Sequence, residues 1–328
     1  MVEELKKIRV LYLYKHKRSF VYRDFDFLKK YFTVKDGFFS LKKILFLPMW
    51  ISKSDVVFIW FAGFHAFIGT IFARLFSKKV VVVTGGYDVA GEKEINYGLM
   101  LNPFLKLMVN FVLKRSNKIL AVSHFNKKEI EKHLGIKENV EMIYNSVDAE
   151  KYYPKGKKDN SIATVGFISW DNVKRKGLDT FVKAAKFLPD VKFLVVGNAS
   201  DNSIDYLKSL ADKNVSFTGF VSDDELLKIY QKAKVYCQLS YYESFGMTPA
   251  EAMLCECIPV VTKRGALPEV AGDTGAFAEY NNDKSTAIAI EKALKLKKGK
   301  EARERIKKLF PTESREKKLR ETIECLKE

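Results

Sequence analysis

Two carboxylates, a glycine and the start of a helix come together in one short segment of the chain. The segment runs from Tyr242 to Met253 (YESFGMTPAEAM), and it contains Glu243, Gly246 and Glu251. A carboxylate in a loop can accept hydrogen bonds from hydroxyl groups, and the free backbone amides at a helix start attract phosphate. The pattern therefore indicates a site for a ligand that carries both hydroxyl and diphosphate groups.

Glu251 also has a purely structural interpretation. Thr248, Pro249 and Glu251 match a capping box, in which a threonine and a glutamate three residues later satisfy the first helical amides, with proline at the first helical position. Both interpretations stay open for Glu251. Glu243 stands directly before Ser-Phe-Gly and has no comparable structural explanation.

Two other glycine loops follow predicted strands. Gly166 comes directly after one strand, and the basic run KRKG at residues 174–177 then leads into a predicted helix. Gly265 follows the strand PVVT at residues 259–262. Cationic side chains and helix-start amides suit phosphate, although a basic loop can also be merely solvated.

Short β-branched runs alternate with helix-length amphipathic stretches along the chain. This alternation predicts βαβ units with parallel sheets, which bind ligands beyond the carboxyl ends of their strands. The predicted strands are Ile8–Tyr14, Val56–Trp60, Val80–Val83, Ile119–Val122, Ser161–Val165, Phe193–Val196, Val215–Thr218, Val235–Leu239 and Pro259–Thr262. The predicted helices include Phe104–Lys114, Lys127–Leu134, Gly177–Phe187, Ser203–Asp212, Asp223–Lys232 and Pro249–Cys255.

The strand pattern restarts after a polar, lysine-rich stretch at residues 147–158. We therefore expect two doubly wound, Rossmann-like α/β domains, residues 1–150 and residues 151–310, that face one another across a cleft. The tail, residues 311–328, is predicted to be a charged helix with Leu319 and Ile323 on one side. It either packs back on the first domain or remains a solvated terminal helix.

The composition favours a folded, globular protein, with 47% hydrophobic and 30% charged residues. The four cysteines form no CxxC pair, which argues against a zinc site or a disulfide framework and for a reducing cytoplasm. The formal net charge of +17 is compatible with nucleic acid, an anionic membrane or a phosphorylated substrate as partner. A generally basic surface is the plainer interpretation.

Two segments bear on membrane targeting. Residues 1–9 carry charges of both signs and no apolar core, so they do not form a signal peptide. Val56–Phe76 is long and apolar enough to resemble a membrane span. Gly63 and His65 inside this run favour a buried strand followed by a helix.

In chain order, the loops that contain Gly166, Glu243 and Gly265 resemble those of the retaining glycosyltransferases of family 4, which have the GT-B fold. The glutamate pair, the EAM that ends the first segment, the PVV strand and the G-x-x-PEV loop at residues 265–270 all match that family's pattern. Ile143–Asp148 is similar to its domain junction, and Ala121–Ser123 also fits. The resemblance covers about residues 80–275.

The resemblance implies a role for each matching residue. Lys176 would contact the donor diphosphate, Glu243 the transferred sugar and Glu251 the ribose hydroxyls. Asp88, in the segment GGYD at residues 85–88, would face the reacting centre beside the catalytic Glu243 and Lys176. The other donor-binding positions are Gly166, Arg175, Phe220, Phe245, Gly246, Met247, Thr248 and Gly265.

The chain departs from the family pattern at several positions. Phe167 stands where the family commonly has arginine, so Arg175 or Lys174 would supply that charge. Gly85 stands where a histidine is common, and Glu256 stands where a glycine is usual. The loop after the first strand is basic (KHKRSF) rather than glycine-rich.

The function implied is transfer of a sugar from a nucleotide-diphosphate sugar to a glycan, lipid-linked or other hydroxyl acceptor, with retention. We expect no metal ion, no cofactor and no nucleic acid partner. The first domain would bind the acceptor and the second the nucleotide sugar. The basic loop of the first domain, with Phe20, Tyr22 and Phe25, would allow peripheral contact with the inner face of an anionic membrane.

Two other classes of protein stay open. One is a different enzyme on the same architecture, such as a nucleotide-sugar epimerase, which needs no acceptor, or a glycosidic phosphorylase. The other is a non-catalytic, basic nucleic-acid-binding protein. The absence of a nucleic-acid-binding motif and the gathering of glycine loops at one sheet edge disfavour the latter.

Overall fold

The computed structural model describes residues 6–326. The chain forms two compact units, Met1–Ser146 with Thr312–Glu328, and Val147–Pro311. The first five residues, on which the signal-peptide prediction partly rests, and the last two residues of the predicted tail helix lie outside the described residues.

The first unit is built on a six-stranded, fully parallel sheet with the strand order β2-β1-β3-β4-β5-β6. Its strands are β1 (Arg9–Tyr14), β2 (Thr33–Phe38), β3 (Val56–Trp60), β4 (Lys79–Thr84), β5 (Lys118–Ala121) and β6 (Val140–Met142). Strands buried on both faces carry nearly continuous hydrophobic runs, as VVFIW of β3 and VVVV of β4 do.

Helices cover both faces of this sheet. Leu11 and Leu13 of β1 face one core together with residues of α3, α4 and α5, whereas Tyr12 donates its hydroxyl to the Val21 carbonyl of α2 on the other face, at 2.5 Å. The helices are α2 (Ser19–Tyr31), α3 (Leu47–Ser52), α4 (Phe64–Leu75), α5 (Pro103–Arg115), α6 (His124–Leu134) and α15 (Thr312–Glu324). Three short 3-10 turns are η1 (Leu41–Phe46), η2 (Lys93–Ile95) and η3 (Leu99–Leu101).

The second unit contains another six-stranded parallel sheet, with the order β12-β11-β10-β7-β8-β9. Its strands are β7 (Asp159–Val165), β8 (Lys192–Val196), β9 (Val215–Phe217), β10 (Ala233–Gln238), β11 (Ile258–Thr262) and β12 (Ala276–Ala278). The chain fills one half of the sheet from β7 to β9 and then crosses back to β10.

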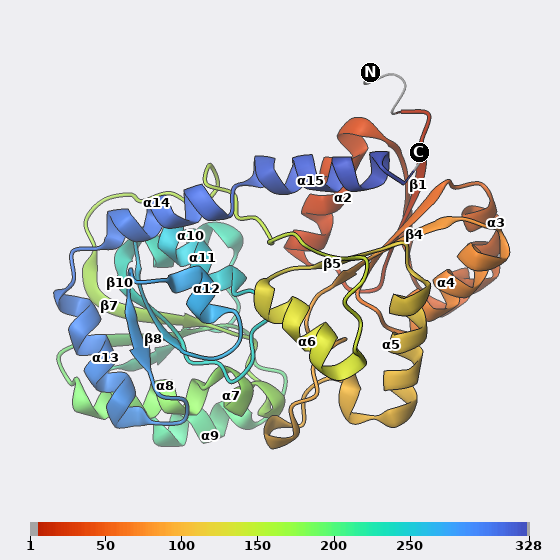
Figure 1. Cartoon of the computed structure of the whole chain (residues 1–328). Coiled ribbons are helices and arrows are strands. Elements are labelled where there is room, and N and C mark those ends of the chain that lie inside the picture. Colours follow the sequence, from red (N-terminus) through yellow and green to blue (C-terminus); the bar gives the residue numbers. More distant parts are fainter. Residues whose placement is uncertain (1–5, 327–328) are drawn as a thin grey trace. The chain divides into compact units, whose positions relative to one another are not determined.

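Helices α8, α9 and α13 cover one face of the second sheet, and α10, α11, α12 and α14 lie on the other (Figure 1). The helices are α7 (Trp170–Lys176), α8 (Leu178–Ala184), α9 (Ser203–Leu210), α10 (Asp223–Lys232), α11 (Met247–Leu254), α12 (Leu267–Ala271), α13 (Asp283–Lys295) and α14 (Gly299–Leu309), with the 3-10 turn η4 (Ala185–Phe187). The two doubly wound α/β sheets predicted from the strand pattern are confirmed.

All nine predicted strands are present, and the membrane-like run at residues 56–76 consists of the buried β3 followed by α4. Within residues 6–326, no helix has the length and apolarity that crossing a membrane requires. The prediction missed β2, β6 and β12, which are three of the four edge strands of the two sheets.

The tail helix α15 belongs to the first unit, where it lies beside α2 (Figure 1). Its buried residues Arg315, Leu319, Thr322 and Ile323 recur at helical spacing and form one face. The prediction that the tail packs on the first domain is therefore confirmed, and the alternative of a solvated helix is wrong.

A buried ion pair fixes α15 to α2. The Arg315 guanidinium donates to both carboxylate oxygens of Asp24, from Nε at 2.6 Å and from Nη2 at 2.7 Å, and the two side chains are 3% and 0% exposed. Trp60 Nε1 also donates to Asp24, at 3.1 Å, and Arg315 Nη1 donates to the carbonyls of Ile143 and Tyr144. Both charges are thus fully hydrogen-bonded, which a buried pair requires.

The first prediction concerns this pair. Asp24→Asn should lower the free energy of unfolding of the first unit by about 3–5 kcal/mol, because Arg315 is left as a buried charge without its counter-ion. Lys30→Ala is the matched control, since it removes the exposed Lys30–Glu316 pair of the same two helices, and it should cost at most about 1 kcal/mol. Urea denaturation of both variants measures the difference, and equal costs would contradict this account of α15.

Candidate functional site

The order of the second sheet reverses at β7, which has β8 on one side and β10 on the other. In open parallel sheets, ligands bind beyond the carboxyl ends of the strands at such a reversal, because the two loops leave in opposite directions. Here these loops are the one that follows Val165 and the one that follows Gln238. The first carries Gly166 and the basic run at residues 174–177, and the second carries Glu243 and Gly246, which were predicted to bind a ligand.

Glu243 lies at the centre of this edge of the sheet. Its Oε1 is 3.5 Å from Lys176 Nζ and 3.8 Å from Arg175 Nη1. All three side chains are mostly buried, with 14–18% of their surfaces exposed. The structure therefore brings together the predicted carboxylate and the two predicted cations, although they are far apart in the sequence.

A row of polar side chains on β10 and directly after it holds Glu243 in place. Gln238 Nε2 and Ser240 Oγ each donate to Glu243 Oε1, at 3.2 Å. The Gln238 amide is itself oriented, because its Oε1 accepts from the Tyr236 hydroxyl at 2.9 Å and from Thr248 Oγ1 at 3.1 Å. The sequence analysis missed this row, yet its signal is visible: residues 236, 238 and 240 are polar at the period of a strand.

Gly265 allows the loop after β11 to contact the backbone of Glu243. The backbone of Gly265 has a φ of +60°, and a Cβ at this position would lie 2.4 Å from the Glu243 carbonyl oxygen. The next residue, Ala266, donates its amide to the same carbonyl at 2.8 Å. The loops after β10 and β11 are thereby joined, and only glycine fits at the point where they touch.

Helix α11 begins earlier than predicted. Its N-cap is Gly246, at a φ of +106°, and no side chain caps the helix, so the first helical residues are Met247 and Thr248 rather than Pro249. Thr248 instead bonds to Gln238. The capping-box interpretation of Glu251 is therefore wrong, and Glu251 lies buried, 6% exposed, in the second half of the helix.

The basic residues also lie differently from the prediction. The short helix α7, which the prediction missed, ends with Lys174, Arg175 and Lys176, and Gly177, at a φ of +65°, separates it from α8. Cations in a last helical turn are favourable for the helix itself. Arg175 extends toward Glu243 and also bonds to Asn172, whereas Lys174 is exposed, so Arg175 is the residue that adds a second charge at this site.

Glycines also bring the ends of β7, β8 and β9 close together. Gly166 donates its amide to Val196, and a Cβ at Gly197 would lie 2.0 Å from the Gly166 carbonyl oxygen. Phe220 follows this group and is 79% exposed, whereas Phe245 is buried with its ring against Phe310, at 5.1 Å between centroids. Phe220 thus offers a ring face for stacking, and Phe245 offers only its backbone.

In the first unit, Asp88 organises the loop after β4. Its carboxylate accepts hydrogen bonds from the amides of Ala62, Gly85 and Gly86, at 2.9, 3.1 and 2.8 Å. The side chain is 1% exposed, and burial raises the pKa of its carboxyl group although these amides counteract the effect. A Cβ at Gly85 would overlap the ring of Phe61, which therefore occupies the space that a larger residue would need.

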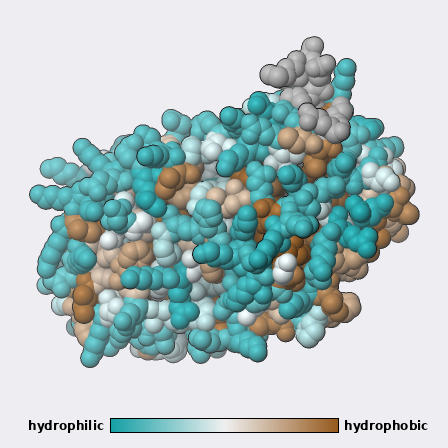
Figure 2. Space-filling view, in the orientation of Figure 1, coloured by the Kyte–Doolittle hydropathy of each residue, from teal (hydrophilic) through white to brown (hydrophobic). Residues whose placement is uncertain are grey.

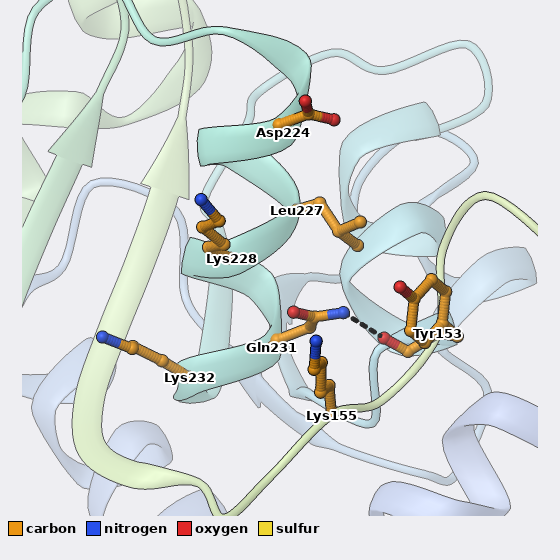
Figure 3. Close-up of a pocket in the computed structure, with 7 residues that line it drawn as sticks. All are labelled: Tyr153, Lys155, Asp224, Leu227, Lys228, Gln231 and Lys232. Atoms are coloured by element: carbon orange, nitrogen blue, oxygen red, sulfur yellow. Dashed lines mark hydrogen bonds between the residues drawn. The ribbon is translucent and has the colours of Figure 1, made fainter.

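A pocket of about 400 Å³ lies elsewhere in the second unit, between α10 and the segment that contains Tyr153 and Lys155 (Figure 3). Gln231 crosses it and donates to the Tyr153 carbonyl at 3.0 Å. The remaining lining residues are Asp224, Leu227, Lys228 and Lys232. None of these residues belongs to the group around Glu243, so this pocket is separate from the predicted site.

Family comparisons agree with this geometry. The model of the family described as Glycosyl transferases group 1 matches residues 149–309, and that of Glycosyltransferase Family 4 matches residues 15–151. Together they cover most of both units. The chain therefore belongs to this glycosyltransferase family, which confirms the resemblance seen in its motifs.

Individual relatives are distant. The O-antigen chain mannosyltransferase RfbU of Salmonella typhimurium is 27% identical over 57% of this chain and 54% of its own length. The alpha-galactosylglucosyldiacylglycerol synthase of Streptococcus pneumoniae is 29% identical over 46% of this chain and 48% of its own length. The chain thus spans about half the length of these curated relatives.

Among solved structures, Anabaena HepE in complex with UDP and glucose is similar to this chain at a TM-score of 0.79. The superposition covers 97% of this chain and 100% of that one, at 16% identity. This likeness shows a shared fold, and the predicted GT-B fold class is confirmed.

The second prediction concerns the Gly265 contact. Gly265→Ala should lower the affinity for a nucleotide sugar at least about tenfold, because the new methyl group forces the loop away from the Glu243 carbonyl. Gly156→Ala is the control: Gly156 has a similar φ of +72°, but a Cβ there meets no atom within 4 Å. Calorimetric titration of both variants checks this, and an equal effect would show that backbone strain alone is responsible.

Proposed function

We propose that this protein transfers a hexose from a nucleotide-diphosphate sugar to a hydroxyl group of an acceptor, with retention of the anomeric configuration. The observation that carries the proposal is the meeting of Glu243, Lys176 and the start of α11 beyond the end of β10. A carboxylate suits sugar hydroxyls, and a cation beside helix-start amides suits a diphosphate. We assign donor binding to the second unit and acceptor binding to the first.

The donor would lie along the carboxyl ends of β7 and β10. Lys176 and Arg175 pair with its diphosphate, together with the amides of residues 245–248 at the start of α11. Gly166 and Gly265 leave room for the phosphates and the sugar, and the exposed ring of Phe220 stacks on the base. The buried Glu251 binds the ribose hydroxyls. UDP is the first nucleotide to test, because HepE is complexed with UDP.

Catalysis in this proposal relies on preorganised charge. As the bond from the sugar C1 to the diphosphate breaks, negative charge grows on the leaving oxygen, where Lys176 and Arg175 stabilise it without reorganising. The acceptor oxygen bonds to C1 on the same face, and its proton passes to a diphosphate oxygen. Glu243 stays fixed by Gln238 and Ser240 beside the transferred sugar. No metal ion is needed in this scheme.

Asp88 acts through the loop that it holds. Its carboxylate keeps the amides of Gly85 and Gly86 turned inward, which fixes the segment that the family resemblance assigns to the reacting centre. Asp88 is then a positioning residue of the first unit.

We further propose a lipid-linked acceptor and a site of action at the cytoplasmic face of a membrane. The name of the pneumococcal relative includes a diacylglycerol. Within η1 and α3, Leu41, Leu45, Phe46 and Met49 are 77%, 85%, 52% and 46% exposed beside Lys42 and Lys43, and apolar atoms gather at the edge over α3 (Figure 2). Apolar side chains flanked by lysines suit an anionic surface. Phe20 and Phe25 of the basic loop and α2 instead pack against Trp60 and Tyr12.

The third prediction tests the carboxylate. Glu243→Ala should lower kcat/KM for sugar transfer by on the order of 10²-fold, about 2.7 kcal/mol, because the group beside the transferred sugar is lost. Glu304→Ala removes an exposed carboxylate of α14 and should leave transfer unchanged. The same assay in excess chelator should retain full turnover. Unchanged transfer in the Glu243 variant would remove the central assignment, and loss of transfer in chelator would refute the metal-free scheme.

The fourth prediction tests the membrane surface. Leu45→Glu should abolish flotation of the protein with vesicles that contain phosphatidylserine, because a charge replaces an apolar side chain at the interface. Ile288→Glu, at a 68% exposed position of α13 in the second unit, should float like the wild type. Wild-type protein that fails to float with these vesicles would contradict membrane contact without affecting the proposed transfer reaction.

A further inference from the structure

A second cluster of ionisable side chains lies in the first unit, outside the residues assigned to transfer. Glu129 and His133 are four residues apart on α6, so they share one helix face, and Glu92 reaches them from the loop that follows β4. One donor atom of each side chain lies within 4.8 Å of the other two. Two carboxylates and one imidazole thus converge from two separate parts of the fold.

Two atoms of this cluster lack hydrogen-bond partners among the described residues. Glu129 is 3% exposed, and its Oε2 accepts no hydrogen bond from residues 6–326. His133 Nε2, 3.4 Å from this oxygen, is likewise buried without a hydrogen bond in the described part of the chain. The contact between these two atoms is an ion pair only if the imidazole is protonated, and neither atom forms a hydrogen bond with any other described residue, which is costly for buried groups.

The backbone around the cluster is tightly fixed. A Cβ at Gly91 would lie 2.8 Å from His133 Cε1 and 3.3 Å from His133 Nε2, so the loop rests directly on the imidazole ring. Glu92 and Tyr97 exchange two backbone hydrogen bonds, which close the following turn. The carboxylate of Glu92 is therefore delivered to the ring by an ordered loop, which a preformed ion site requires.

We propose that Glu92, Glu129 and His133 bind one divalent transition-metal ion of the Zn²⁺ type. Zinc bonds to imidazole nitrogen and carboxylate oxygen at about 2.0–2.2 Å, so neighbouring donors around a tetrahedral ion lie roughly 3.3 Å apart. The separation of Glu129 Oε2 and His133 Nε2, 3.4 Å, fits this geometry. Mg²⁺ and Ca²⁺ prefer oxygen ligands in larger number, and an imidazole disfavours them here.

Lys132 is the competitor for this site. Its ammonium group lies 3.1 Å from Glu129 Oε1 and 3.6 Å from Glu92 Oε1, so it partly neutralises both carboxylates in the absence of an ion. The Lys132 side chain is 57% exposed and can turn into solvent when an ion binds. Metal affinity should therefore increase when this charge is removed.

A bound ion would join the loop after β4 to α6. Glu92 follows Asp88 in the same loop, and Asp88 holds the amides of Gly85 and Gly86. The site would thus stiffen the loop from one end while Asp88 fixes the other. It takes no part in the transfer chemistry, and it does not depend on the proposed function.

The fifth prediction is tested by titrating chelator-stripped protein with ZnCl₂ in a calorimeter and with CoCl₂ by visible absorption, in a Cys325→Ser background that removes the exposed thiol. One equivalent should bind. Glu129→Gln and His133→Ala should each weaken binding by about 10–100-fold or more, since loss even of an outer-shell partner has effects of this size. Glu131→Gln, an exposed carboxylate on the same helix, is the matched control and should bind like the background protein.

Lys132→Met provides a test that does not disturb the buried side chains, and it should bind Zn²⁺ more tightly than the background protein. Circular dichroism of each metal-free variant verifies that it is folded. Failure of the background protein to bind Zn²⁺ below about 0.1 mM would overturn the proposal, and so would unchanged affinity in the folded Glu129 and His133 variants. Sugar transfer is measured separately, so either result leaves the proposed function to its own test.

Discussion

The carboxylate of Glu243 stands at a position where the fold leaves it little freedom. Parallel strands deliver their carboxyl ends to one edge, and the reversal of strand order at β7 places the loops after β7 and β10 beside each other at that edge. Lys176 and Arg175 approach Oε1 from the end of α7, and Gln238 and Ser240 approach it from the end of β10 and the residues just after it. Gly265 closes the third side through the Glu243 carbonyl. The donor site of the proposed function is the consequence of this one arrangement.

Strands were predictable where the sequence has a clear hydrophobic run and were missed where it has none. Central strands such as β3 and β4 are continuous hydrophobic runs, because both of their faces are buried. The missed strand β2 reads TVKDGF and is mostly exposed at the edge of its sheet, so it has neither alternation nor a hydrophobic run. The strands β6 (VEM) and β12 (AFA) are three residues long and contain at most one β-branched residue each, so they lack the β-branched runs from which the other strands were predicted.

The site was predictable in its residue types and less so in its local geometry. Glu243 and the basic run that contains Lys176 were identified from the residue pattern, the resemblance assigned their roles, and the structure brings Glu243 and Lys176 within 3.5 Å. The start of α11 was misplaced, because a Thr-Pro pair is a stronger helix-start signal than Gly246. The row from Tyr236 to Ser240 was missed, because the partners of buried polar groups come from separate segments and no single segment reveals them.

Two departures from the family pattern have structural explanations. The family commonly has a histidine at the position of Gly85. In this chain the ring of Phe61, whose own φ is +68°, fills the space that the histidine side chain would need. Glu256 stands at a φ of +66°, a conformation that favours glycine, and this explains why glycine is usual there. Neither departure touches the group around Glu243.

The central claim is that the protein breaks the bond between a sugar and a nucleoside diphosphate with retention. Stoichiometric protein incubated with UDP-, GDP- and ADP-sugars, followed by ³¹P and ¹H NMR, tests it without knowledge of the natural acceptor, because water can accept the sugar slowly. The account predicts release of one nucleoside diphosphate and first formation of the sugar anomer with the donor's configuration. Consumption of none of these donors, or first formation of the opposite anomer, would contradict it.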